Sequence, residues 1–189
     1  PSALPQLATE PPPTEMTHDH MTHIRDAFVR AAQRADRMGI EAIELHGAHG
    51  YLIHEFLSPI ANQRSDEYGG NFDNRIRFPL EVFAAVRKVF SGVLGIRISA
   101  SDWIDGAWDV AQSAEFAKRI KALGCDFIHV SSGGISPAQK IALGAGYQVP
   151  FARDVRQASG LPTMAVGLIT DAHQAEAVLQ AGAADLVAL

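Results

Sequence analysis

Apolar runs and amphipathic stretches alternate along this chain from residue 17 onward. In the first stretch, apolar residues recur at the three- and four-residue spacing of one helix face: Ile24, Phe28, Ala31 and Ala35. Gly39 follows, and the apolar run 40–45 comes directly after it. The pattern predicts a helix that ends at a glycine and leads into a buried strand.

The same alternation continues to the last residue, so that each predicted helix is followed by a predicted strand. The helices are expected at about 17–38, 74–90, 110–123, 151–159 and 171–181, and the strands at 40–45, 93–99, 127–131, 163–166 and 186–189. Such alternation is typical of right-handed βαβ crossovers and a parallel sheet. Residues 1–16 are rich in proline and are expected to form an extended loop.

Two α/β architectures accommodate this pattern. A doubly wound sheet fits the length of 189 residues, but neither a Gly-x-Gly-x-x-Gly fingerprint nor a phosphate-binding Gly-Lys-Ser/Thr loop follows any strand. A complete (β/α)₈ barrel takes about 250 residues. The chain begins at Pro1 and ends inside the apolar run 186–189, so we expect a part of a longer protein. We predict one domain, residues 1–189, that forms a partial (β/α)₈ (TIM) barrel.

Composition narrows the possible environments and partners. The content of 47% hydrophobic and 20% charged residues is typical of a soluble globular protein. A net charge of -5 without any Lys/Arg run argues against nucleic acid as a partner. No apolar run approaches the ~20 residues that span a bilayer. Cys125 is the single cysteine, so we expect no disulfide, a buried inert thiol and a cytoplasmic location.

Two histidines and a tyrosine follow the first predicted strand. Catalytic residues of a barrel lie where the strands end, and His46, His49 and Tyr51 lie there. As metal ligands the histidines would need a third partner such as His54 or Glu55, and their spacing is not that of a helical zinc site. They could also be structural side chains. We favour two N–H donors for one substrate oxygen, and we expect no metal.

Arg97 is unusual because it interrupts an apolar strand. Burying a guanidinium is costly unless it meets an anion or another acceptor. One interpretation is an ion pair with a carboxylate of the barrel, and the other is a cation held under a bound anion or an electron-rich ring. Gly133, Gly134 and Gly167 at later strand ends are small enough for their amides to approach a phosphate.

These motifs together resemble the old yellow enzyme family, FMN-dependent ene-reductases and NAD(P)H dehydrogenases on a (β/α)₈ barrel. The similarity is carried by residues 46–59, residues 62–70, Asn74-Arg75-x-Arg77-Phe78, residues 97–102 and residues 165–167. The His-x-x-His spacing is similar to that of the bacterial thermophilic-like branch. By this resemblance the chain corresponds to barrel strands four to eight. The first three strands and a phosphate-binding Gly-Arg after Leu189 are then absent from it.

The resemblance also implies roles for individual residues. It implies that His46 and His49 bind the carbonyl oxygen of an α,β-unsaturated substrate, with Tyr51 beside them as proton donor or substrate contact. It implies that cofactor-binding residues are Arg97, Ser132, Gly133, Val166 and Gly167.

The implied cofactor is FMN, reduced by NAD(P)H, and the implied substrates are enones and enals. The full-length protein is expected to be a homo-oligomer. Two alternatives stay open: the barrel domain of a dienoyl-CoA reductase or amine dehydrogenase-type flavoenzyme, and an inactive fragment.

Overall fold

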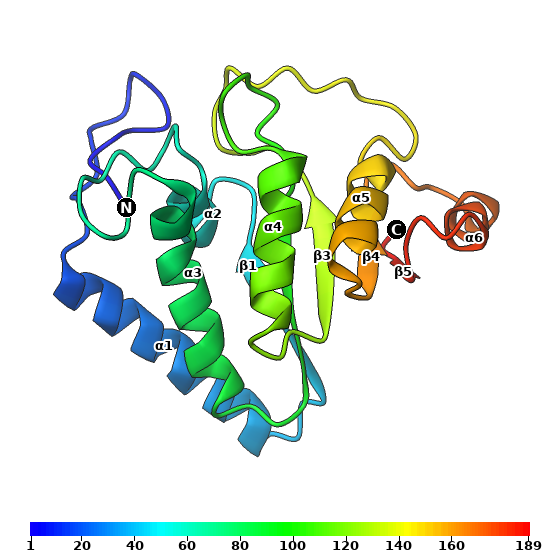
Figure 1. The fold of residues 1–189 in the computed structure, drawn as a ribbon, viewed down its shortest axis with the longest axis horizontal. Helices are drawn as coiled ribbons and strands as arrows, with labels where there is room; N and C mark the ends of the chain where they lie inside the picture. Colours follow the sequence, from blue (N-terminus) through cyan, green and yellow to red (C-terminus); the bar gives the residue numbers. More distant parts are fainter.

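The structure is a computed structural model that describes residues 1–189 (Figure 1). Helices and strands alternate after an N-terminal segment, residues 1–16, that contains neither. The elements are α1 (His18–Arg37), β1 (Ala42–Gly47), α2 (Leu52–Leu57), α3 (Phe72–Arg87), β2 (Val93–Ser99), α4 (Val110–Lys121), β3 (Phe127–Ser131), α5 (Val149–Ser159), β4 (Thr163–Ala165), α6 (Ala172–Gln180) and β5 (Leu186–Val187). None of the helices has the length and apolar character that crossing a bilayer requires.

The strands form one parallel sheet in the order β1-β2-β3-β4-β5. A doubly wound sheet reverses its strand order at a switch point, whereas a barrel adds each strand on the same side of the last. Helices α3, α4 and α5 all lie in front of the strands in Figure 1. Sequential order with helices on one side is that of a barrel segment, and the predicted partial (β/α)₈ fold is confirmed.

The sheet has one apolar and one polar face, which β2 illustrates. Leu94, Ile96 and Ile98 are fully buried and belong to the core that the helices cover. Because side chains alternate along a strand, Arg97 and Ser99 face the other way, toward what would be the lumen of a complete barrel. The fold therefore brings polar side chains of successive strands together on the face that the helices leave uncovered.

Three elements begin two residues away from their predicted starts. The first strand begins at Ala42 rather than Ile40, whose side chain is 45% exposed, and it continues through His46 and Gly47 in register with β2. Helix α3 begins before residue 74 because Asn71 caps it and accepts the backbone N–H of Asn74. Helix α5 begins at Val149, with a proline in its first turn. Helix α2, of six residues, was not predicted because it is too short for a periodic pattern.

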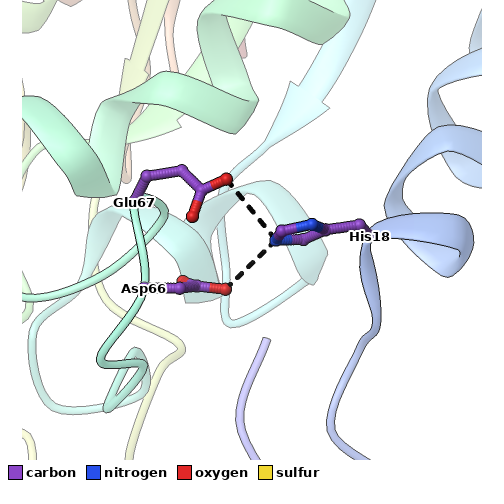
Figure 2. Close-up of side chains that lie close together, drawn as sticks. All are labelled: His18, Asp66 and Glu67. Carbon is purple, nitrogen blue, oxygen red and sulfur yellow. Dashed lines mark ion pairs between the residues drawn. The ribbon is translucent and has the colours of Figure 1, made fainter.

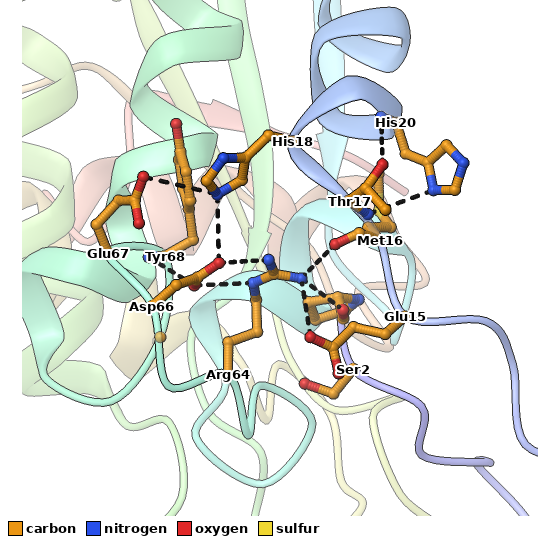
Figure 3. Close-up of polar contacts among 12 residues, drawn as sticks. Ser2, Glu15, Met16, Thr17, His18, His20, Arg64, Asp66, Glu67 and Tyr68 are labelled. Atoms are coloured by element: carbon orange, nitrogen blue, oxygen red, sulfur yellow. Dashed lines mark hydrogen bonds and ion pairs between the residues drawn. The ribbon is translucent and has the colours of Figure 1, made fainter.

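Arg64 fastens the N-terminal segment to the loop between α2 and α3 (Figure 3). Its Nη1 donates to the carbonyl oxygens of Pro1 at 3.1 Å and Met16 at 2.6 Å. Its Nε and Nη2 both bind the carboxylate of Asp66. The Arg64 hydrogen bonds hold the pKa of Asp66 down at about 2. This loop is structural, because its charges tie two distant segments together.

Candidate functional site

His46, His49 and Tyr51 converge at the carboxyl end of β1. The ring centroids of His46 and His49 lie 5.3 Å apart, and those of His46 and Tyr51 lie 5.2 Å apart. His46 is the last but one residue of β1, and Tyr51 is the N-cap of α2. Two imidazoles and a phenol thus share one small surface, with Tyr51 65% exposed.

The backbone that carries His49 is strained and held from both sides. His49 adopts a φ of 58° and Gly50 one of 79°, so two consecutive residues are left-handed. The His49 N–H donates to Ser99 Oγ and the Gly50 N–H donates to His54 Nδ1, both at 2.9 Å. A Cβ on Gly50 would overlap the carbonyl oxygen of Gly134, so only glycine allows the two loops to approach this closely.

The His49 imidazole is fixed by a hydroxyl and kept neutral by its surroundings. Its Nε2 lies 2.7 Å from Ser131 Oγ, at the end of β3. Burial, and then the positive charge of Arg97, lower the pKa of His49 to about 4. The same two causes, in the same order, lower the pKa of His46. Both rings are therefore neutral at pH 7, and each offers one N–H donor.

Arg97 has no hydrogen-bond or ion-pair partner, and its Nε is buried. In the sheet it pairs with His46 on one side and His129 on the other. The expected alternative, an ion pair with a barrel carboxylate, is not found, because Glu44 binds His129 Nδ1 at 3.0 Å instead. A half-exposed guanidinium without a counterion fits a site for an anion or an electron-rich ring.

Gln148 connects the loops that follow β3 and β4. Its Oε1 accepts the hydroxyl of Ser132 at 2.6 Å, and its Nε2 donates to the Val166 carbonyl at 3.2 Å. A Cβ on Gly167, whose φ is 118°, would lie 2.6 Å from Gln148 Nε2. The structure thus brings Ser132, Val166 and Gly167 together around a residue that sequence reasoning missed. Nothing in its loop sequence marks Gln148 as a bridge.

The amides of Gly133 and Gly134 are already paired. The Gly133 N–H donates to the carbonyl oxygen of Ser101 at 2.8 Å, and the Gly134 N–H donates to Gln139 Oε1 at 2.7 Å. The expectation that both amides are available to a phosphate does not agree with these bonds. In this structure the two glycines shape the loop after β3 instead.

The histidine pair lacks the third ligand that a metal would need. His54 turns into the core, where its Nε2 lies 2.8 Å from Asp102 Oδ1. A different group lies close enough to hold a metal: His18 Nε2 is 3.4 Å from Asp66 Oδ2 and 3.6 Å from Glu67 Oε1 (Figure 2). Arg64 already occupies both oxygens of Asp66 (Figure 3), so these contacts are surface ion pairs.

A sequentially ordered parallel sheet with a polar site at its carboxyl ends defines a barrel protein of the kind that binds ligands at that end. The chain belongs to the NADH:flavin oxidoreductase / NADH oxidase family, which it matches over residues 2–189. It is 50% identical over 189 residues to an NADPH dehydrogenase of Geobacillus thermodenitrificans (strain NG80-2). That alignment covers 100% of this chain and 55% of the relative, so the chain spans about half the length of this curated relative.

Two solved structures show the same fold. A complex of 2-naphthoyl-CoA reductase superimposes with a TM-score of 0.90 at 26% identity, over 99% of this chain and 30% of that one. Morphinone reductase superimposes with a TM-score of 0.76 at 31% identity, over 95% of this chain and 48% of that one. The chain is thus similar to one segment of each of these longer proteins.

Proposed function

We propose that the protein carrying this chain is an FMN-dependent oxidoreductase that uses NAD(P)H to reduce the activated C=C bond of α,β-unsaturated carbonyl compounds. The observation that carries the proposal is the pairing of two neutral imidazoles, His46 and His49, beside the unpartnered Arg97. Membership of a flavin oxidoreductase family supports the cofactor. The proposal covers the whole protein, of which this chain supplies one part.

The residues present fit a flavin. Arg97, whose guanidinium lacks a counterion, would hold the electron-rich edge of the ring system. Ser132, Val166 and Gly167, gathered by Gln148, would form the wall on the phosphate side, with Gly133 shaping the loop. When bound, FMN would supply hydride transfer from NAD(P)H to the substrate.

The histidine pair would bind and polarise the substrate carbonyl. Negative charge grows on that oxygen as the C=C bond is reduced, so two fixed N–H donors bind the transition state more tightly than the substrate. Ser131 Oγ has one hydrogen, which it can donate to His49 Nε2 at 2.7 Å or to Gln148 Oε1 at 3.3 Å. In the shorter of these arrangements the proton of the neutral His49 ring lies on Nδ1 and is available to the oxygen. The exposed hydroxyl of Tyr51 is the candidate proton donor for the α-carbon.

The test uses the full-length protein with FMN, NADPH and 2-cyclohexenone. We expect a yellow protein that NADPH bleaches without oxygen and that the enone re-oxidises. Replacing His46 or His49 with alanine should each lower kcat by about 10²–10³-fold, the usual cost of losing one oxyanion donor. A protein that takes up no FMN, or whose alanine variants reduce the enone at the wild-type rate, would contradict the proposal.

A second candidate substrate class is the conjugated CoA thioester. The high TM-score against 2-naphthoyl-CoA reductase favours it, because a thioester carbonyl conjugated to a ring or alkene could occupy the same pair of donors. The kcat/KM values for 2-cyclohexenone and for 2-naphthoyl-CoA, measured with the same preparation, discriminate between the two classes.

A further inference from the structure

His54, in the short helix α2, is fully buried and hydrogen-bonded at both ring nitrogens. Its Nδ1 accepts the backbone N–H of Gly50 at 2.9 Å, and its Nε2 lies 2.8 Å from Asp102 Oδ1. Because a peptide N–H can only donate, Nδ1 must carry a lone pair. The ring proton is therefore on Nε2, where it is donated to the carboxylate.

Asp102, in the loop after β2, is fully buried and fixed from three sides. One oxygen accepts from His54, and the other accepts the Ser58 hydroxyl at 2.6 Å and the Trp108 N–H at 3.0 Å. A carboxylate held in this way accepts but does not donate, so it selects the His54 form whose Nδ1 can accept. The pair lies outside the surface formed by His46, His49 and Tyr51.

We propose that His54, oriented by Asp102, is the positioning residue for His49, a role that rests on the proposed function. The left-handed turn at His49 and Gly50 presents two N–H groups, and each has one side-chain acceptor, Ser99 and His54 respectively. Without the His54 acceptor the Gly50 N–H is left unsatisfied at a half-buried position. The turn then relaxes, and the His49 ring leaves Ser131.

The proposal is specific because the chain offers a matched control. Ser58, the C-cap of α2, donates to the same carboxylate but makes no hydrogen bond with Gly50. Ser58→Ala therefore weakens the buried cluster and leaves the turn intact. His54→Phe fills the space without an acceptor, whereas His54→Asn can place its Oδ1 near the position of Nδ1 and accept the Gly50 N–H.

The experiment measures kcat and KM for 2-cyclohexenone and the NMR titration of His49 in the full-length protein. In His54→Phe we expect kcat/KM to fall by about 10²-fold, as misplacement by an ångström can cost. The pKa of His49 should rise from about 4 toward its ordinary value. His54→Asn should restore most of both properties, and Ser58→Ala should lower Tm with wild-type kinetics and titration.

A folded His54→Phe protein with an unchanged His49 titration would overturn the proposal, and so would a Ser58→Ala protein with the same kinetic loss. If His54→Phe does not fold, His54→Met replaces it, because a flexible thioether adapts to irregular space and is a weak acceptor. The titration needs no turnover. A wild-type protein inactive on enones would therefore refute the proposed function, and the His49 titration would still decide whether His54 positions His49.

Discussion

His49 Nε2 lies 2.7 Å from Ser131 Oγ, and this contact joins the turn after β1 to the end of β3. The partner of the ring is a neutral hydroxyl, and the nearby charge is the cation Arg97. Burial disfavours the protonated form of His49 most, Arg97 disfavours it further, and no carboxylate partner offsets them, so the ring stays neutral at pH 7.

Acid should destabilise the protein through this ring. The pKa of His49 is lowered to about 4 in the folded state, mainly by burial, whereas an unfolded histidine has a pKa of about 6.5. Between these values only the unfolded state gains the proton, so the contribution is complete above about pH 6.5 and is lost as pH falls toward 4. Urea unfolding of wild type and His49→Gln at about pH 7 and pH 5 checks this. The variant should lose less stability, and equal losses would contradict the assignment.

Replacing Arg97 should separate stability from cofactor binding. The guanidinium has no partner, so Arg97→Met should raise the free energy of unfolding of the FMN-free protein by about 1 kcal/mol. The same variant should bind FMN at least about tenfold more weakly, because the cation that would hold the flavin is removed. Urea unfolding and quenching of FMN fluorescence measure the two effects.

Arg75 provides the control for this pair of measurements. Arg75 is buried and, unlike Arg97, has partners: it donates to the carbonyl oxygens of Leu57 and Gly70 and to Gln112 Oε1. Arg75→Met should lower the free energy of unfolding by about 3 kcal/mol, because three acceptors lose their donor. If Arg97→Met lowers the free energy of unfolding as much as Arg75→Met does, the Arg97 charge is compensated in solution and the prediction is wrong.

Cys125 should be unreactive until the protein unfolds. The thiol is buried, and this burial raises its pKa to about 12, so almost no thiolate exists at pH 8. Its hydrogen is donated to the Phe127 carbonyl. We expect one thiol per chain to react with Ellman's reagent in 6 M guanidinium chloride and almost none in the native protein. Rapid modification of the native protein would show that this end of β3 opens.

Strands with continuous apolar sequences were predicted well, and contacts between polar residues were not. The bounds of β2 and β3 agree with the prediction. Apart from Arg97 and His129, every residue of these two strands is apolar or small, so the sequence pattern marks both ends of each strand. In β1 the apolar run ended at residue 45, but the strand continues through His46, which faces the uncovered side.

The candidate site shows the same limit. The positions of His46, His49 and Arg97 followed from the rule that strand ends carry the chemistry. The His54–Asp102 bond joins residues 48 positions apart, and Gln148 bridges two loops, so neither could be read from local spacing. Such pairings depend on how the loops fold over one another.

The turn that carries His49 should not tolerate a side chain at Gly50. In Gly50→Ala the φ of 79° becomes strained because the residue now has a side chain. The new Cβ also overlaps the carbonyl oxygen of Gly134, so the two loops must separate. We expect a loss of about 3 kcal/mol in the free energy of unfolding and a rise in the pKa of His49. Gly39→Ala is the matched control, because its φ is 73° and no atom lies within 4 Å of its Cβ position. It should cost only about 1 kcal/mol, with His49 unchanged. Urea unfolding and NMR titration of His49 compare the two variants, and equal costs would show that strain alone, rather than contact between the loops, makes glycine necessary there.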